Sequence, residues 1–596
     1  MLVNTVVFIE NENDEPIESV FHHNIKSLLS MKNAVSTGVY KMNGICGYTG
    51  NDEKIIEKMA ERIAHREPRG RVYNADGTLS VELDCEIKEE TLLQLFEAHG
   101  EKMLDLISGS FAFLIYNHET GEIFAARDCF GIKPLYYGIF GGELVYASEI
   151  KAFLEYPNFV KEINHEALES YLSFQYSVLD ETFFKGIFKL PAAHFLKYSN
   201  GELKIERYWQ AMFSAENLPL EKIVDEIDES VKKSVQIQQE SDSPIGSLLS
   251  GGVDSSYVAA VADKIEKTFT VGFDYAGFNE IEFAKNLSSE KNIENISKII
   301  STDEYWDVLP KIQYFMDEPL ADPAAVAQFF ACKLAGEHVK CVLSGEGADE
   351  LFGGYGIYRE PLDLAPITRL PMFLRKFLGF LARKFPFKIK GRNYFIRASK
   401  TVEERFIGNA YIFNEEERTE ILKNPSGITN SQITKPYYDK AKDLDDITKM
   451  QFLDIHLWLV GDILHNADRM AAANSLEMRV PFLDKDIFAI ASKIPTKYRV
   501  NKRMGKFAFR IAAKRNFIDK REKKRMGFPV PTRHWLREEK YYNIVMDAFK
   551  QEFMAEFFNT DKLVTMLDRH KSGKEDNSRK IWTVYTFALW YGEFFE

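Results

Sequence analysis

The sequence predicts two domains of different fold class: an α+β domain with mostly antiparallel strands, followed by a larger α/β domain with a parallel sheet. At 596 residues, the chain is longer than one hydrophobic core usually supports. With 45% hydrophobic and 28% charged residues, its composition is that of globular domains. We expect a preface of unknown role at residues 1–41, the first domain at 42–210 and the second at 211–596.

Short β-type runs separated by turn residues predict the first domain. The clearest are FAFLIYN at Phe111–Asn117 and GELVYAS at Gly142–Ser148. From Leu220 the pattern changes to an amphipathic helix, LEKIVDEIDESVKKSVQIQ, and then to strands that alternate with helices. The runs IGSLLS, FTVGFD and VKCVLS each end near glycine, acidic or hydroxyl residues. Because binding sites in parallel sheets lie at the carboxyl ends of the strands, these ends are candidate site positions.

Charge and cysteine content narrow the class of partner. The net charge of −13, with both signs mixed along the chain, argues against a general nucleic-acid binder. Five cysteines without a CxxC pair indicate neither a disulfide framework nor a zinc site. No apolar run reaches the roughly 18 to 20 residues of a membrane span, and the N-terminus has no secretory signal. We therefore expect a cytoplasmic protein with small-molecule substrates and no nucleic-acid or membrane partner.

One segment allows a second interpretation. Residues 369–392 are basic and aromatic, with Phe373, Phe377, Phe380 and Leu381 at helical spacing. Such a helix can lie on a membrane surface or bind a polyanion. A helix that packs its aromatic stripe on the domain has the same pattern, and we favour that alternative.

The run SGGVDSS at residues 250–256 predicts an anion-binding loop. Gly251 and Gly252 let backbone N–H groups approach a ligand, the following helix adds its positive end, and Ser250, Ser255 and Ser256 supply hydroxyls. Asp254 fits such a site if a Mg²⁺ ion lies between it and phosphate oxygens. No lysine follows the glycines, so this is not the GxxxxGK[ST] loop.

SGGVDSS resembles the pyrophosphate-binding loop of the N-type ATP pyrophosphatases, and its surroundings resemble the glutamine-dependent asparagine synthetases. The other motifs of that family follow in order: TVGFD (Thr270–Asp274), MDEPLADPAA (Met316–Ala325), LSGEGADELFGGY (Leu343–Tyr355), ADRM with SLEMRVPFLD (Ala467–Met470 and Ser475–Asp484) and GFPVP (Gly527–Pro531). The resemblance implies a truncated, Ntn-type glutaminase-like sandwich and then an ATP-pyrophosphatase (adenine nucleotide alpha hydrolase-like) domain. It also allows a homodimer.

The resemblance implies ATP and Mg²⁺ as cofactors and a two-step reaction. A substrate carboxylate attacks the α-phosphate of ATP, pyrophosphate leaves, and an amine then displaces AMP. Asp254 and Asp349 match the Mg²⁺ carboxylates, and Glu346 matches the group that accepts a proton from ammonia. Four positions match residues that hold the nucleotide: Leu249, Val271, Ser344 and Gly345. For Glu346 and Glu350, helix capping or structural pairing is the alternative.

The synthetase half departs from the family at several positions. A family lysine that steadies the adenylating transition state is replaced by Arg525, although Lys523 and Lys524 stand just before it. We take Arg525 and Lys524 as catalytic candidates. Asn466 stands at a position that is often lysine in close relatives, and Ala471–Ala473 replaces Ser-Met-Ala.

The first domain lacks the family's glutaminase residues. Asn43 stands at the position of the nucleophilic cysteine, and a carboxamide cannot form a thioester. Cys46 is expected to be a core residue. Glu67 replaces a glycine of the HRGPD turn, and the Arg-Leu-Ser glutamine clamp is missing. The run Asp84–Ile87 replaces Asn-Gly-Glu-Ile, so the oxyanion donors are lost. The scaffold runs RDCFGIKPLYY (Arg127–Tyr137) and ASEIKA (Ala147–Ala152) are intact.

Three functions therefore stay open. The leading one is an ATP-dependent ligase of the asparagine synthetase type, with conversion of aspartate to asparagine as the leading reaction and ammonia or a substrate amine in place of glutamine. The second is a specialised relative, similar to the β-lactam synthetases and lasso-peptide cyclases. The third is an ATP-binding pseudoenzyme that regulates a complete paralogue.

Overall fold

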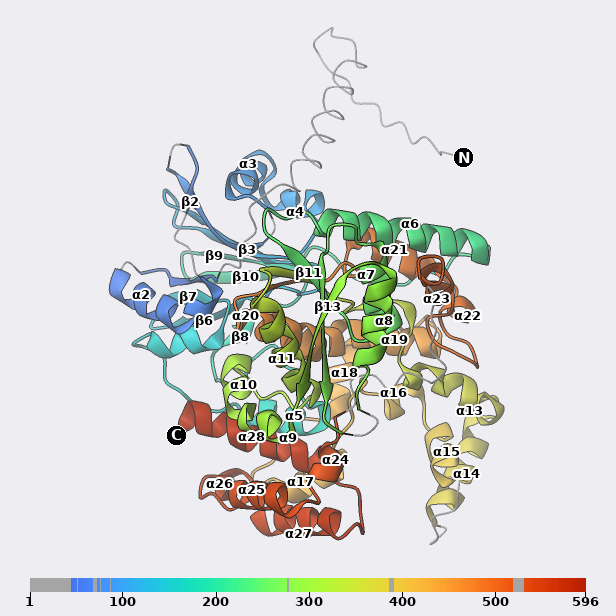
Figure 1. Ribbon diagram of the computed structural model, residues 1–596. Coiled ribbons are helices and arrows are strands. Elements are labelled where there is room, and N and C mark those ends of the chain that lie inside the picture. The colour runs from blue at the N-terminus through green and yellow to red at the C-terminus, as the bar shows by residue number, and fades with distance from the viewer. Residues whose placement is uncertain are drawn as a thin grey trace.

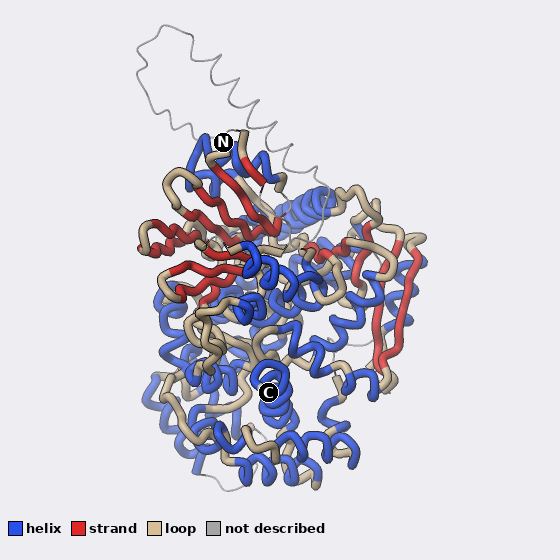
Figure 2. Tube along the Cα trace, turned by 90° about the vertical axis from the view of Figure 1, so that its left-hand side faces the viewer, coloured by secondary structure: helices blue, strands red, loops and turns tan. Residues whose placement is uncertain are grey.

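The computed structural model describes residues 44–50, 52–67, 72–75, 77–85, 87–275, 278–384, 391–517 and 530–596. Antiparallel strands dominate the first part of the chain, and helices gathered around a parallel sheet make up the rest (Figures 1 and 2). The predicted preface, residues 1–41, lies outside the described residues. The limits of the two domains stay predictions.

Two antiparallel sheets stack face to face in the first domain. The four-stranded sheet has the order β1 (Cys46–Tyr48), β7 (Glu143–Ala147), β6 (Tyr136–Phe140), β8 (Phe188–Lys189). The six-stranded sheet has the order β10 (Glu202–Arg207), β9 (His194–Ser199), β5 (Ile123–Arg127), β4 (Phe111–Asn117), β3 (Leu79–Cys85), β2 (Val72–Tyr73). One cluster of buried side chains joins Leu144 of the first sheet to Leu114 and Leu196 of the second. Helix α2 (Glu53–Arg62) contacts β1, and α3 (Glu89–His99) contacts β3.

The second domain contains the predicted parallel sheet. Its order is β13 (Glu294–Ile300), β12 (Lys267–Phe273), β11 (Ile245–Leu248), β14 (Cys341–Leu343), β15 (Glu477–Arg479). Every pair of neighbours is parallel. Because β12 and β13 lie on one side of β11, and β14 and β15 on the other, the strand order reverses between β11 and β14. Ligands bind at such reversal points in open α/β sheets.

Both faces of the parallel sheet are covered. Val342 of β14 belongs to one buried cluster, and its neighbours Cys341 and Leu343 belong to another, as the alternation of side chains along a strand requires. Helix α11 (Ala324–Gly336) contacts β12 and β13. Helices α6 (Leu220–Gln238) and α7 (Val253–Val261) contribute to the second cluster.

The largest hydrophobic cluster crosses the predicted domain limit at residue 210. It joins α5 (His165–Phe174) to the C-terminal helix α28 (Ser578–Phe595). The Tyr171 hydroxyl donates to the Thr583 carbonyl at 2.8 Å, and the rings of Phe183 and Trp590 are 5.1 Å apart. The two domains therefore share one core.

Helices α13 (Glu360–Thr368), α14 (Met372–Lys384) and α15 (Arg392–Ala398) form a projection at the lower right of Figure 1. The expectation that the aromatic stripe of residues 369–392 packs on the domain is wrong for its described part. Phe373 is 70% exposed and Phe377 is 57% exposed. Within the described residues, no helix is long and apolar enough to cross a bilayer.

Candidate active site

The loop predicted to bind an anion follows β11 and leads directly into α7. Gly251 has a φ of 71°, a left-handed conformation that favours glycine. The Ser250 amide donates to Ser255 Oγ at 3.2 Å, and the two serine hydroxyls are also 3.2 Å apart. Both hydroxyls therefore gather at the helix N-terminus, which attracts phosphate groups.

A second loop, after β14, meets the first. Residues 344–347 lead into α12 (Ala348–Phe352), and Gly347 has a φ of 86°. A Cβ atom at Gly345 would lie 2.7 Å from the Ser255 amide nitrogen, so a side chain there would force the two loops apart. Ser344 Oγ lies 3.4 Å from Glu346 Oε1.

One cavity brings the two loops together with β12. Ten residues singled out from the sequence line it: Leu249, Ser250, Asp254, Ser255, Val271, Ser344, Gly345, Glu346, Asp349 and Glu350. The other residues of the predicted cradle, Gly251, Gly252 and Ser256, lie in the same loop and at the start of α7. Three of the sequence motifs, SGGVDSS, TVGFD and LSGEGADELFGGY, therefore meet at the reversal point of the strand order.

Lys506 is a component of the site that the sequence motifs did not reveal. Its ammonium nitrogen lies 2.6 Å from Asp254 Oδ1 and 2.5 Å from Asp349 Oδ1. The residue is 1% exposed and has a φ of 55°, a conformation that is unfavourable for a residue with a side chain. It immediately precedes α23 (Phe507–Ala513), where the positive end of the helix disfavours a cation. The position of this lysine, directly before an apolar helix, is the only feature of the local sequence that could have indicated Lys506 as a site residue.

The positions of Asp254 and Asp349 fit a shared cation. One carboxylate oxygen of each lies within 2.6 Å of the same nitrogen, so the two groups are close enough to hold one ion between them. Mg²⁺ is commonly bound by one or two carboxylates together with substrate phosphates. Among the described residues, no group of three or more His, Cys, Asp or Glu side chains forms a metal site independent of substrate.

Glu350 is buried next to these carboxylates and is structurally paired. Burial and the neighbouring Asp349 raise its pKa to about 8. The Tyr355 hydroxyl donates to Glu350 Oε1 at 2.6 Å. This hydrogen bond is consistent with the alternative of structural pairing for Glu350.

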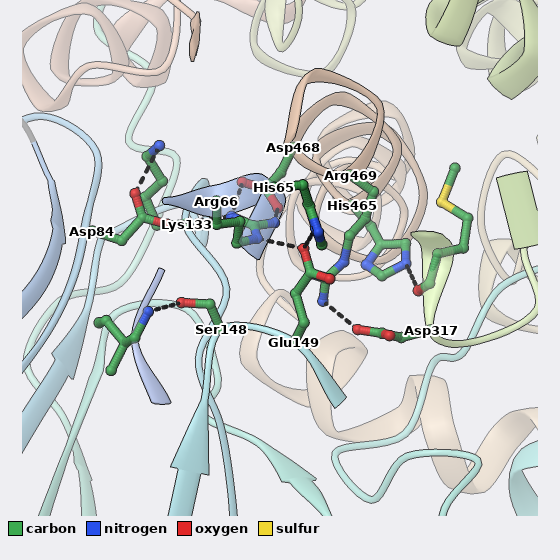
Figure 3. A network of polar contacts seen from close by, with 12 residues as sticks. His65, Arg66, Asp84, Lys133, Ser148, Glu149, Asp317, His465, Asp468 and Arg469 are labelled. Atoms are coloured by element: carbon green, nitrogen blue, oxygen red, sulfur yellow. Dashed lines mark hydrogen bonds and ion pairs between the residues drawn. The ribbon is translucent and has the colours of Figure 1, made fainter. Parts of the chain in front are cut away.

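A second polar cluster, buried between the two domains, is shown in Figure 3. Arg66 is fully buried and pairs with Glu149 and Asp84 of the first domain and with Asp468 of the second. Asp84, at the end of β3, also lies 3.1 Å from the Lys133 ammonium. Asp84, which the family resemblance aligns with the oxyanion-hole motif, is thus a buried carboxylate that accepts hydrogen bonds and cannot donate one when ionised.

Glu149 and Asp317 extend this cluster. Glu149 lies 2.9 Å from His65 Nε2 and 3.0 Å from Arg469, and also pairs with Lys151. Asp317, from the second domain, lies 2.8 Å from Lys151 and 3.2 Å from Arg469. We call Arg66, Asp84, Lys133, Glu149, Lys151, Asp317, Asp468 and Arg469 the interdomain network; it contains four cations and four anions.

Comparison with known proteins identifies the family. A family model described as asparagine synthase matches residues 226–592, more than half of the chain. This chain belongs to the asparagine synthetase family. A second model, described as a glutamine amidotransferase domain, matches residues 77–209. The predicted fold class, a glutaminase-like sandwich followed by a parallel-sheet synthetase domain, is confirmed.

Curated members of the asparagine synthetase family are similar over most of their length. "Asparagine synthetase [glutamine-hydrolyzing] 1" of Bacillus subtilis is 40% identical over 88% of this chain and 82% of its own. A putative asparagine synthetase [glutamine-hydrolyzing] of Mycobacterium bovis is 37% identical over 89% and 82%. A solved glutamine phosphoribosylpyrophosphate amidotransferase of B. subtilis matches with 14% identity over 43% of this chain and 45% of its own, at a TM-score of 0.15. That likeness is too weak to support an argument.

Several expectations drawn from the family fall on residues that the structure does not describe. Asn43, Lys523, Lys524, Arg525 and most of GFPVP lie outside the described residues, and their roles stay predictions. Cys46 is confirmed as a core residue, and burial raises the pKa of its thiol. Glu67 has a φ of 48°, in the left-handed region, which explains why the family motif has glycine there.

The cations of the interdomain network lower the pKa of Glu149, and the stability of the protein at acid pH tests this shift. Burial alone would raise the pKa of Glu149, but Lys151, His65, Arg469 and Arg66 together hold it well below its usual range. A carboxyl group with a lowered pKa stabilises the fold above its unfolded-state pKa of about 4.3, and this contribution is lost as the pH falls toward the folded-state value.

We expect Glu149→Gln to lose less stability than the wild type between pH 5 and pH 3. Urea unfolding across this range measures the difference, with Glu155→Gln, at a partly exposed ion pair, as the control. If the free energy of unfolding fell equally with pH in Glu149→Gln and in the wild type, the lowered pKa of Glu149 would be contradicted.

Proposed function

We propose that this protein is an ATP-dependent, amide-forming ligase that activates the carboxylate of aspartate as an acyl-adenylate. The observation that carries the proposal is the pairing of Asp254 and Asp349 with one buried ammonium at the meeting point of the two glycine loops. The lysine and the helix N-terminus, together with a Mg²⁺ ion that the two carboxylates would hold, can neutralise the negative charge of a departing pyrophosphate.

Each residue of the site has a task in this proposal. The Ser250 and Ser255 hydroxyls, with the backbone amides of their loop, hold the β- and γ-phosphates. Lys506 donates to phosphate oxygens as the pyrophosphate leaves. Asp254 and Asp349 would hold Mg²⁺, which supplies Lewis-acid stabilisation when bound. Glu346 accepts the proton that the attacking amine loses.

We further propose that glutamine is not the nitrogen donor. Asn43 replaces the nucleophile, and the buried Asp84 carboxylate stands where the family motif has the oxyanion-hole asparagine. Ammonia or an amine of the substrate then attacks the adenylate directly. We also infer a cytoplasmic location, which the buried cysteines Cys46, Cys129 and Cys332 support, since none of them forms a disulfide within the described residues.

ATP–pyrophosphate exchange and AMP release test the reaction. With aspartate and ammonium we expect exchange, AMP and asparagine, whereas aspartate and glutamine should give no asparagine. Asparagine formation from glutamine at a rate close to that with ammonium would contradict the loss of glutaminase activity. The same assay after mutation of Asn43 to Gln serves as a control, because neither amide can form a thioester.

The assay also separates the two other functions. AMP release with a peptide or a modified amino acid, and none with aspartate, would indicate a specialised relative similar to the β-lactam synthetases. Binding of ATP without exchange under any condition would indicate a pseudoenzyme. Equilibrium dialysis with ATP distinguishes this last outcome from a damaged preparation.

A further inference from the structure

Helix α14 packs through one narrow face and leaves an aromatic face uncovered. The packed face includes Gly379, where a Cβ atom would collide with the Ser399 side chain. On the same face Arg375 donates to the carbonyls of Ala398 and Lys400 at 2.8 Å and 2.7 Å, which connects α14 to the end of α15 and to the residues just after it. Because small residues allow close contact between helices, Gly379 lets this face of α14 pack against the Ser399 segment.

The uncovered face consists of large apolar side chains. At 100° per residue, positions 373, 377, 380 and 381, together with 374, fall within one third of the helix circumference, opposite Gly379 and Arg375. All five are at least one-third exposed: Phe373 70%, Leu374 38%, Phe377 57%, Phe380 49% and Leu381 37%. We call these five residues the aromatic stripe. Monomeric proteins seldom expose such a group of side chains without a binding role.

Exposed cations of α14 lie near the aromatic stripe. From residue 364 to residue 402 the sequence has ten lysines and arginines and no aspartate or glutamate, although the whole chain carries a net charge of −13. Lys376, Arg383 and Lys384 of α14 are exposed, and the Lys384 ammonium lies 4.6 Å from the centre of the Phe380 ring. Apolar side chains flanked by cations are typical of helices that lie in the interface of an anionic membrane.

We propose that α14 docks this protein on the surface of an anionic phospholipid bilayer. The aromatic stripe enters the boundary between headgroups and acyl chains, and the flanking cations contact lipid phosphates. The helix lies at the outer end of a projection, so a flat surface can reach it (Figure 1). A polyanion could bind the cations of α14 but would leave five apolar side chains exposed. A second copy of this chain would place like charges next to one another, which is unfavourable. This inference departs from the expectation of no membrane partner and does not depend on the proposed reaction.

Co-sedimentation of the full-length protein with vesicles tests the inference. We expect binding to vesicles of equal parts phosphatidylglycerol and phosphatidylcholine, weaker binding to pure phosphatidylcholine, and a loss of binding as salt rises. The triple variant Phe373→Ser, Phe377→Ser, Phe380→Ser should bind at least about tenfold more weakly. Lys376→Glu with Lys384→Glu should remove the preference for phosphatidylglycerol.

Matched controls separate docking from a general surface effect. Val160 is 77% exposed and Ile139 is 45% exposed on the first domain, so Val160→Ser with Ile139→Ser removes comparable apolar surface elsewhere and should not alter binding. Thermal unfolding of each variant checks that it is folded. As a positive signal, Phe377→Trp should shift its fluorescence to shorter wavelength with anionic vesicles.

Four outcomes would overturn the inference. They are no sedimentation with anionic vesicles, equal sedimentation of the triple variant, binding to heparin without binding to vesicles, and a dimer in light scattering that the triple variant dissociates while vesicles are not bound. These outcomes would indicate, in turn, no membrane binding, membrane binding through another surface, binding of a polyanion, and dimerisation through the aromatic stripe.

Discussion

Replacement of Lys506 by methionine is expected to reduce the rate of ATP–pyrophosphate exchange by at least about 100-fold, the usual effect of removing one preorganised donor from a transition state. Methionine keeps most of the apolar stem and removes the charge. Asp254 and Asp349 would then face each other without the ammonium that lies within 2.6 Å of both. The phosphate site would change from one cation and two anions to two anions alone.

The control for Lys506→Met is Lys514→Met. Lys514 follows the same helix, α23, and is exposed, so its loss should leave exchange unchanged. Lys506→Arg keeps the charge but not the compact ammonium, and should restore only part of the rate. If Lys506→Met lowered the thermal unfolding midpoint while exchange continued at the wild-type rate, Lys506 would be a structural residue only.

Replacement of Arg66 by methionine is expected to lower the free energy of unfolding by about 3–5 kcal/mol. Arg66 is fully buried and pairs with three carboxylates, from Asp84, Glu149 and Asp468. Removing only the cation leaves these charges buried without their partner, which is far less favourable than replacing the whole group by apolar residues. Urea unfolding followed by circular dichroism measures the difference.

Arg62→Met is the matched control for Arg66→Met. Arg62 lies four residues earlier and pairs with Glu155 at 2.5 Å, but 43% of its side chain is exposed, so its loss should change stability by less than about 1 kcal/mol. Equal effects of the two substitutions would show that the interdomain network contributes no more than a surface ion pair. A double variant, Arg66→Met with Glu149→Gln, should be more stable than the sum of its single effects predicts.

The parallel sheet and the glycine loops that follow its strands could be predicted because they depend on local sequence patterns. The strand–glycine–helix pattern around Gly251 predicts both a turn and an anion site, and β11, β12 and β14 overlap the three runs singled out from the sequence. The strand β4 covers the predicted residues Phe111–Asn117. In each case, side-chain alternation and turn residues fix the structure within a few positions.

The remaining features depend on contacts between residues far apart in the sequence. Lys506 is separated from Asp254 by 252 positions, and nothing in its local pattern names its partner. The expectation that the aromatic stripe packs on the domain is wrong because helical periodicity defines an apolar face but does not say whether another element covers it. Here the face with Gly379 packs, because the missing side chain allows Ser399 to approach the helix closely.

The shared core that joins α5 to α28 makes the two halves of this protein one cooperative unit. A protease that cuts between β10 and α6 would break the chain but should not release two stable fragments, because each fragment would expose the apolar surface that the other covers. The N-terminal half thus covers apolar surface of the C-terminal half, and we expect this packing to stabilise the C-terminal half. Its loss by truncation would remove the synthetase half from solution as well.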